Sequence, residues 1–247
     1  MFSKLFLGIK FSFSYFSIFP IKFQATDNLS DKEVLNNMLL SLPLVGWFIG
    51  LVTLLVYAIF AHTGWYGALI SALFSMILYG FLHTEAIIDV FDALYASHSG
   101  KDAYEIIKEP TVGAVGVLYG VSFLLIKVAS IVFLFTHNLF AEFLSILIIS
   151  RLSLLTLFIL HDFKSSFLTE LKNALNKKGL ILIFIIAIII GSWITPLFTV
   201  LLLLGVLIGF IISLILAFKL NFVNGDVLGT TLEGVEIVLF MFVALLV

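Results

Sequence analysis

Three carboxylates stand at helical spacing in a polar stretch between two long apolar runs. Glu85, Asp89 and Asp92 occupy positions i, i+4 and i+7, which on an α-helix places them within an arc of about 60°. Like charges crowded on one helix face repel each other unless a cation lies among them. Mg²⁺ prefers oxygen ligands and usually keeps waters and substrate phosphates in its shell. We therefore predict a Mg²⁺ site here rather than a solvated helix face.

Several nearby residues extend this candidate site. His83 lies on nearly the opposite side of the same predicted helix, as either a hydrogen-bonded histidine or a general base. Lys108 belongs to a short helix predicted over 99–109, where surface ion pairs explain it equally well. Gly113 and Gly116 begin the next apolar run. Glycines at a helix N-terminus let free N–H groups approach an anion, although glycines also serve packing between membrane helices.

A second polar turn, Asn224-Gly225-Asp226, interrupts the C-terminal apolar sequence. It is either a plain tight turn or the source of another carboxylate for the metal. Arg151 is the only arginine and lies midway along an apolar run. A charge within lipid costs about 2.5–3.5 kcal/mol on insertion scales, so it normally faces a partner inside the bundle. We expect Arg151 to pair with a carboxylate, with a role at the substrate as the alternative.

The composition defines the elements that must position these residues. Of 247 residues, 62% are hydrophobic and 11% are charged, against about 25% charged in soluble domains. The chain is predicted to be a single all-α integral membrane domain over 1–247, in contact with the lipid bilayer. A net charge of −2 gives no indication of nucleic-acid binding, and the absence of cysteine excludes disulfides and thiolate metal ligands. A homo-oligomer is compatible with the sequence.

About seven runs are long enough to cross a bilayer, which takes roughly 20 apolar residues. The predicted spans are 39–60, 64–82, 113–135, 139–160, 179–195, 197–218 and 227–247. Residues 1–35 are predicted to form an interfacial segment, with a short first span as the alternative.

Lysine placement predicts the orientation of these spans. Every basic residue except Lys127 and Arg151 falls on the same side as the N-terminus, which the positive-inside rule makes cytoplasmic. The acidic motif region (83–112) and a basic loop (161–178) would then face the cytoplasm. The predicted location is the bacterial cytoplasmic (inner) membrane.

These motifs, in this order, resemble the adenosylcobinamide-GDP ribazoletransferase (cobalamin synthase) family over most of the chain. Its central signature, His-x-Asp-Gly-x-x-Asp-x-x-Asp-Gly, is followed by Lys-Asp-x-Arg-x-Gly-x-x-Gly. The matching segments here are His83–Ala93, Lys108–Gly116, Pro43–Gly46 with Gly50, Ser150-Arg151 and Gly225–Gly229. Five matches in the correct order are far more specific than any one of them.

The sequence departs from the family pattern at five positions. Two aspartates are replaced by Glu85 and Glu109, two glycines by Ala86 and Ala93, and the arginine by Thr111. The alanines favour a continuous helix, since glycine destabilises helix interiors. Thr111 removes a phosphate contact that the pattern implies.

The resemblance implies an Mg²⁺-dependent enzyme that joins adenosylcobinamide-GDP to α-ribazole or its 5′-phosphate. The products would be adenosylcobalamin (or its 5′-phosphate) and GMP, in the last stage of nucleotide-loop assembly in cobalamin biosynthesis. The metal ligands would be Glu85, Asp89, Asp92 and Asp226, and the catalytic residues His83, Asp89 and Asp92, with either Asp89 or His83 as the general base. Substrate and phosphate contacts would come from Lys108, Gly113, Gly116, Asn224, Gly225 and Arg151.

Three other interpretations remain open at this point. A CDP-alcohol phosphotransferase-like enzyme also binds metal and diphosphate through acids, but its signature requires an arginine that the acidic motif lacks. A cation-coupled transporter is suggested by the intramembrane residues Lys127, Glu142, Arg151, Glu233 and Glu236. A degenerate relative that binds corrinoid without turnover is the third.

Overall fold

The computed structural model describes residues 2–98, 100, 102–109 and 111–247, and every regular element in these ranges is a helix. In chain order they are α1 (Phe2–Phe16), α2 (Lys32–Leu40), α3 (Leu42–Phe60), η1 (Ala61–Thr63), α4 (Trp65–Leu78), α5 (Leu82–Ser97), α6 (Ala103–Lys108), α7 (Ala114–Thr136), α8 (Phe140–Leu160), α9 (Ser166–Ala174), α10 (Lys177–Ile194), α11 (Phe198–Leu220) and α12 (Gly225–Ala244). The predicted all-α membrane bundle is confirmed.

In the described part of the chain, six helices are long and apolar enough to cross a membrane: α3 with η1, α7, α8, α10, α11 and α12. The predicted second span, 64–82, differs. Its helix α4 has 14 residues, about 21 Å, which is less than the roughly 30 Å of a bilayer core. The chain then bends by 78° into α5. The acidic helix α5 therefore does not continue α4 in a straight line and is not by itself one of the six spanning helices. Taken together as one broken span, α4 and α5 would bring the number to the seven that the sequence predicts.

The break between α4 and α5 has a local cause at Gly80. The Gly80 N–H donates to the Ile77 carbonyl at 2.9 Å, and the Phe81 N–H donates to the Met76 carbonyl at 3.1 Å. These two bonds form a Schellman motif, which needs a left-handed residue at the Gly80 position. Gly80 and Phe81 both have positive φ, 65° and 55°. A Gly at the first of these positions permits the turn, and α5 begins directly after it.

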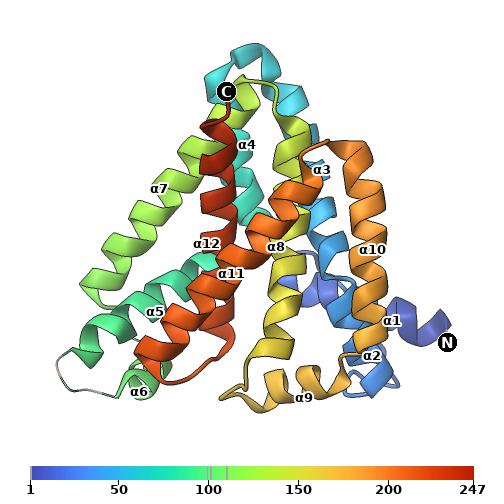
Figure 1. The fold of residues 1–247 in the computed structure, drawn as a ribbon, viewed down its shortest axis with the longest axis vertical. Coiled ribbons are helices and arrows are strands. Elements are labelled where there is room, and N and C mark those ends of the chain that lie inside the picture. The colour runs from blue at the N-terminus through green and yellow to red at the C-terminus, as the bar shows by residue number, and fades with distance from the viewer. Residues whose placement is uncertain (1, 99, 101, 110) are drawn as a thin grey trace.

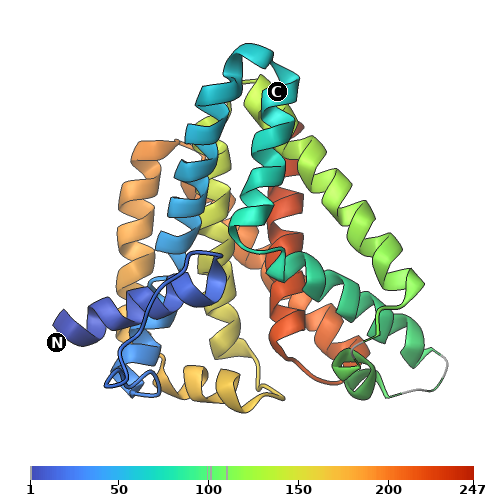
Figure 2. The same ribbon diagram turned by 180° about the vertical axis from the view of Figure 1, so that it is seen from behind.

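The molecule is a wedge, narrow near the C-terminus and broad at the opposite end, as Figure 1 shows. The helices α1, α2, α5, α6 and α9 lie at the broad end, which we call the wide end. Figure 2 shows α1 running across the spanning helices rather than along them. At 15 residues, about 22 Å, α1 is too short for the alternative of a first span.

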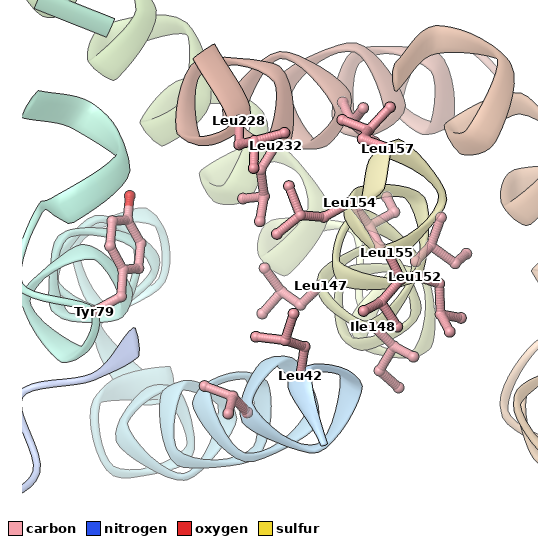
Figure 3. Close-up of a cluster of buried hydrophobic side chains, with 14 of the residues drawn as sticks. Leu42, Tyr79, Leu147, Ile148, Leu152, Leu154, Leu155, Leu157, Leu228 and Leu232 are labelled. Carbon is pink, nitrogen blue, oxygen red and sulfur yellow. The ribbon is translucent and has the colours of Figure 1, made fainter. Parts of the chain in front are cut away.

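Helix α8 forms the centre of the bundle. In its most apolar stretch 83% of residues are buried, against 11% for the peripheral α10. Leucines from α8 meet Leu42 of α3 and Leu232 of α12 in one cluster (Figure 3). Two glycines allow α3 to approach closely, since a methyl group at Gly50 would lie 2.6 Å from Leu144 Cδ1, and one at Gly46 would strike the Leu147 carbonyl. Small residues serve helix contacts in membranes in this way.

The short helices of the wide end begin with side-chain caps. The predicted helix over 99–109 is α6, which starts later, and the Asp102 carboxylate accepts from the Tyr104 N–H at 2.8 Å. Positions 99, 101 and 110 lie outside the described residues. In α9, the Ser165 hydroxyl accepts from the Leu168 N–H at 3.4 Å. Such caps satisfy N–H groups that a helix start leaves unpaired.

Candidate functional site

The site is built where α5 crosses α12 at the wide end. Gly229 of α12 lies against α5, and a methyl group there would come within 2.9 Å of Ala86 Cβ and 3.4 Å of His83 Nδ1. One residue further, the Thr230 hydroxyl donates to the Ala86 carbonyl at 2.9 Å. Asp226 is one turn before Gly229. This crossing therefore brings an acid of α12 to the acids of α5.

Four carboxylates gather at this crossing, Glu85, Asp89, Asp92 and Asp226, which we call the acidic cluster. Asp89 is half-buried, and its pKa is raised to about 6, first by burial and then by the charges of Asp226, Glu85 and Asp92. Among the described residues, no Lys, Arg or His nitrogen lies within 4 Å of a carboxylate oxygen of the cluster. Negative charge thus accumulates here without a protein cation to neutralise it.

Asp92 differs from the other three acids because both of its oxygens accept hydrogen bonds from backbone N–H groups. The Gly113 N–H donates to Asp92 Oδ2 at 2.6 Å, and the Gly116 N–H donates to Asp92 Oδ1 at 2.7 Å. Asp92 therefore caps α7 from a different helix, by charge-assisted bonds at the positive end of the α7 dipole. In this structure the two N–H groups donate to Asp92 rather than to an open anion site. Phosphate binding by Gly113 and Gly116 stays a prediction.

The turn before α12 fixes Asp226. The Asn224 side chain caps the helix, accepting from the Val227 N–H at 3.1 Å, and its amide donates to Asp226 Oδ2 at 2.7 Å. Gly225 is exposed and has open space where a side chain would be. Asn224 positions the carboxylate, and the Gly225 backbone remains accessible.

Arg151 is buried away from the acidic cluster. Its guanidinium pairs with Glu236 and donates to the Ser150 hydroxyl at 2.9 Å. Lys127 of α7 completes this network, 2.6 Å from both Glu233 Oε2 and Glu236 Oε2. The expected pairing of Arg151 with a carboxylate is confirmed. Two cations and two anions from α7, α8 and α12 balance each other inside the bundle.

A cationic surface that the sequence did not indicate lies around Tyr104 of α6. Lys108 Nζ is 3.8 Å and Lys164 Nζ 3.6 Å from the Tyr104 ring centroid. Lys108 also pairs with Glu105 at 3.7 Å, as its spacing predicted. The Lys164 N–H donates to the Val223 carbonyl at 2.8 Å, which joins this surface to the turn before Asp226. Lys164 was predicted only as part of a solvated loop, and its sequence neighbours carry no signal for this contact.

His83 lies on the inner face of α5, in the wall of a cavity of about 130 Å³. It is buried, and its ring centroid is 5.4 Å from that of Tyr79 and 6.5 Å from that of Phe16. Gly225 and Asp226 also line this cavity. His83 and Asp89 thus face opposite sides of α5, as their spacing predicted.

The acidic cluster suits Mg²⁺ by the chemistry of its donors. Carboxylate oxygens are the ligands that this ion prefers, and the pKa of Asp89 is raised by burial first and then by the neighbouring carboxylates. Among the described residues, no three His, Cys, Asp or Glu side chains already surround one point as a formed metal site.

The fold and these residues define a polytopic helical membrane protein with an acidic cluster at one end. The chain belongs to the family described as Cobalamin-5-phosphate synthase, which matches residues 8–244.

Named relatives agree with this family. An adenosylcobinamide-GDP ribazoletransferase from Clostridium botulinum is 31% identical over 117 residues, 46% of this chain and 45% of that protein. One from Clostridium tetani is 30% identical over 135 residues, 53% of each chain. One from Chlorobium chlorochromatii is 27% identical over 124 residues, 49% of each. The chain thus spans about half the length of the relatives it matches. No solved structure matches.

Proposed function

We propose that this protein joins adenosylcobinamide-GDP to α-ribazole, or to α-ribazole 5′-phosphate, with release of GMP. Family membership and the names of the relatives support this reaction. The observation that carries it is the meeting of Asp226 from α12 with Glu85 and Asp89 from α5. These unneutralised acids form a cluster suited to a metal-bound diphosphate, at the end of the bundle where the basic loops lie.

In this reaction a ribose hydroxyl attacks the phosphorus nearest cobinamide. The bond from that phosphorus to the bridging oxygen breaks, and GMP leaves with the bridging oxygen. Glu85, Asp89 and Asp226 would hold Mg²⁺, with Asp92 fixing α5 against α7. When bound, Mg²⁺ would neutralise charge on the diphosphate and on the leaving group.

The hydroxyl must also lose a proton. Of the two bases that the sequence leaves open, the geometry favours an oxygen of Asp89, because it faces Asp226 across the helix crossing, whereas His83 lies on the inner face of α5. Lys108 would contact phosphate from the surface around Tyr104, together with Lys164. Arg151 would stabilise the bundle, since its guanidinium is committed to Glu236.

We further propose that the wide end faces the cytoplasm of the bacterial inner membrane, where both soluble substrates would be found. The lysines at this end support that orientation. The transporter interpretation is weakened because Lys127, Arg151, Glu233 and Glu236 pair with one another.

The test is GMP release by purified protein in liposomes, given adenosylcobinamide-GDP, α-ribazole 5′-phosphate and Mg²⁺. We expect GMP and the joined corrinoid in equal amounts, with loss of both in EDTA. Asp226→Asn should lower the rate by about 100-fold or more, within the range of enzymatic proton-transfer and metal-ligand effects. The control is Asp162→Asn, a fully exposed carboxylate at the same end, which should leave the rate unchanged. Folded wild-type protein that releases no GMP with either acceptor would refute the proposal.

A further inference from the structure

A partly open cavity lies beside the acidic cluster, and the metal site does not explain its role. It has a volume of about 130 Å³ and is lined by residues of α1, α5, α8, α9 and α12, with contributions from α2 and α3. Cavities of about this size, about 150 Å³ when engineered, bind a single benzene ring. The cavity therefore suits one small flat ring system and excludes a corrin macrocycle.

The walls of this cavity are rich in aromatic rings. The Tyr15 and Phe167 ring centroids are 5.6 Å apart, and those of Tyr15 and Phe16 are 4.8 Å apart. Leu154 and Leu168 complete the apolar surface. Aromatic guests gain edge-to-face and offset contacts in such surroundings, beyond the burial of their area.

Besides Tyr15 and Asp226, His83 contributes a polar side chain to this largely apolar lining. His83 lines the cavity with only 5% of its surface exposed. Within the described residues, its ring nitrogens have no hydrogen-bond partner, and they are not among the fully buried unpaired atoms. They therefore stay free to bond a heteroatom of a ligand, and the imidazole is complementary to one. The cavity therefore favours a nitrogen heterocycle over a hydrocarbon.

The polar rim of the cavity gives the orientation of such a ligand. Gly225 and Asp226 lie in the lining, and Asp226 is also a member of the acidic cluster. A sugar attached to a ring inside the cavity would leave it beside Asp226. Its hydroxyls would then be next to the carboxylates of α5.

We propose that this cavity binds the flat heterocyclic base of the nucleoside acceptor, with His83 hydrogen-bonded to a ring nitrogen. The inference rests on the proposed function, because it identifies how the same site takes its second substrate. The site then has two parts, an apolar cavity for the base of the acceptor and a charged surface for the diphosphate of the donor.

The first test measures binding of α-ribazole, and of free 5,6-dimethylbenzimidazole, to purified protein without corrinoid. We expect both to bind and to compete with each other. His83→Phe keeps a ring of similar size but removes the hydrogen bond, and should weaken binding about tenfold. Equal affinity in the wild type and His83→Phe would overturn the assignment of His83.

A matched pair of leucines on α8 provides the second test. Leu154 lines the cavity, whereas Leu155 is fully buried in the core beside it and does not line it. Leu154→Ala should raise the KM for the acceptor several-fold, leave the KM for adenosylcobinamide-GDP unchanged, and favour acceptors with a bulkier base. Leu155→Ala should change neither KM. Identical acceptor preference in the two variants would overturn the inference.

These results separate the inference from the proposed function. GMP release with an acceptor KM unaffected by Leu154→Ala and by His83→Phe would leave the reaction intact and refute the cavity as the base site. Binding of α-ribazole that is sensitive to both variants, without any GMP release, would support the cavity and refute the reaction.

Discussion

Asp89 and Asp92 show how two residues of one type, one turn apart, acquire different roles. Both oxygens of Asp92 accept backbone N–H groups at the start of α7, so its charge is stabilised where it lies. Asp89 faces other carboxylates, and its pKa is raised to about 6 by burial and by their charge. Asp92 is therefore expected to stabilise the structure, and Asp89 to bind a cation.

Asp92→Asn should destabilise the protein. Hydrogen bonds to a charged group contribute about 1.5–3 kcal/mol each, and an asparagine keeps one acceptor while turning an N–H₂ toward the other donor. We expect a loss of about 2 kcal/mol, by the same rule, measured as a lower melting temperature in detergent, with faster proteolysis just before Gly113. Asp162→Asn is the control, and unchanged proteolysis in Asp92→Asn would contradict the capping role.

Asp89→Asn, unlike Asp92→Asn, should not lower the melting temperature of the metal-free protein. In EDTA the substitution takes one charge out of a repelling cluster, so the melting temperature should stay level or rise. Mg²⁺ should stabilise the wild type by binding only the folded state, and this increase should shrink in the variant. A melting temperature in EDTA that falls as far as that of Asp92→Asn would show that Asp89 is structural instead.

At the scale of elements, the crossing of α5 and α12 creates the site. Helix α5 can meet α12 only because α4 ends at Leu78 and the chain turns by 78° through Gly80. The contact itself depends on Gly229, which lets α12 lie directly against Ala86 and His83. The distance between Asp226 and the acids of α5 is set by this contact.

Gly229→Ala should push the two helices apart. Its methyl group would come within 2.9 Å of Ala86 Cβ, and overpacking of this kind typically costs about 1–3 kcal/mol. We expect a lower melting temperature and a loss of activity larger than the loss of folded protein. Gly225→Ala has open space around it, so it should leave the melting temperature unchanged or slightly higher. Equal stability of the two variants would show that the crossing tolerates a wider spacing.

The sequence predicted the helices from their apolar runs but not the way they meet. The carboxylate stripe of α5 and the helix through Ala86 and Ala93 follow from local spacing and propensity, and the structure confirms that helix. The bend was missed because Phe81, an unusual residue for positive φ, follows Gly80 there. The sequence left Asp226 open as either part of a plain turn or another carboxylate for the metal, since contact between segments far apart in the chain depends on packing, which spacing does not encode.

At the scale of the whole molecule, buried charges hold together the helices that support the site. Lys127, Glu233, Glu236 and Arg151 lie between α7, α8 and α12, while Asp92 and Gly229 attach α5 to α7 and α12. The network and the acidic cluster thus share α12, and Asp92 of the cluster also caps α7, which carries Lys127. A change in the network should reach the site by moving these helices, without contact between the network and the substrates.

Glu236→Gln tests whether this network holds the bundle together. Glu236 is fully buried and contacts both Lys127 and Arg151. Among the described residues, its loss leaves Lys127 with Glu233 alone and Arg151 without an acid within 4 Å. Breaking a buried pair by removing one partner typically costs about 3–5 kcal/mol, far more than the loss of an exposed pair such as Lys172–Asp162. We expect a large drop in melting temperature for Glu236→Gln and no measurable drop for Asp162→Asn. Replacing Arg151 by Met in the Glu236→Gln protein should recover much of the loss, because Lys127 and Glu233, 2.6 Å apart, then remain as one cation facing one anion. A double variant no more stable than Glu236→Gln would mean that the unpaired charge of Arg151 is not the cause of the loss.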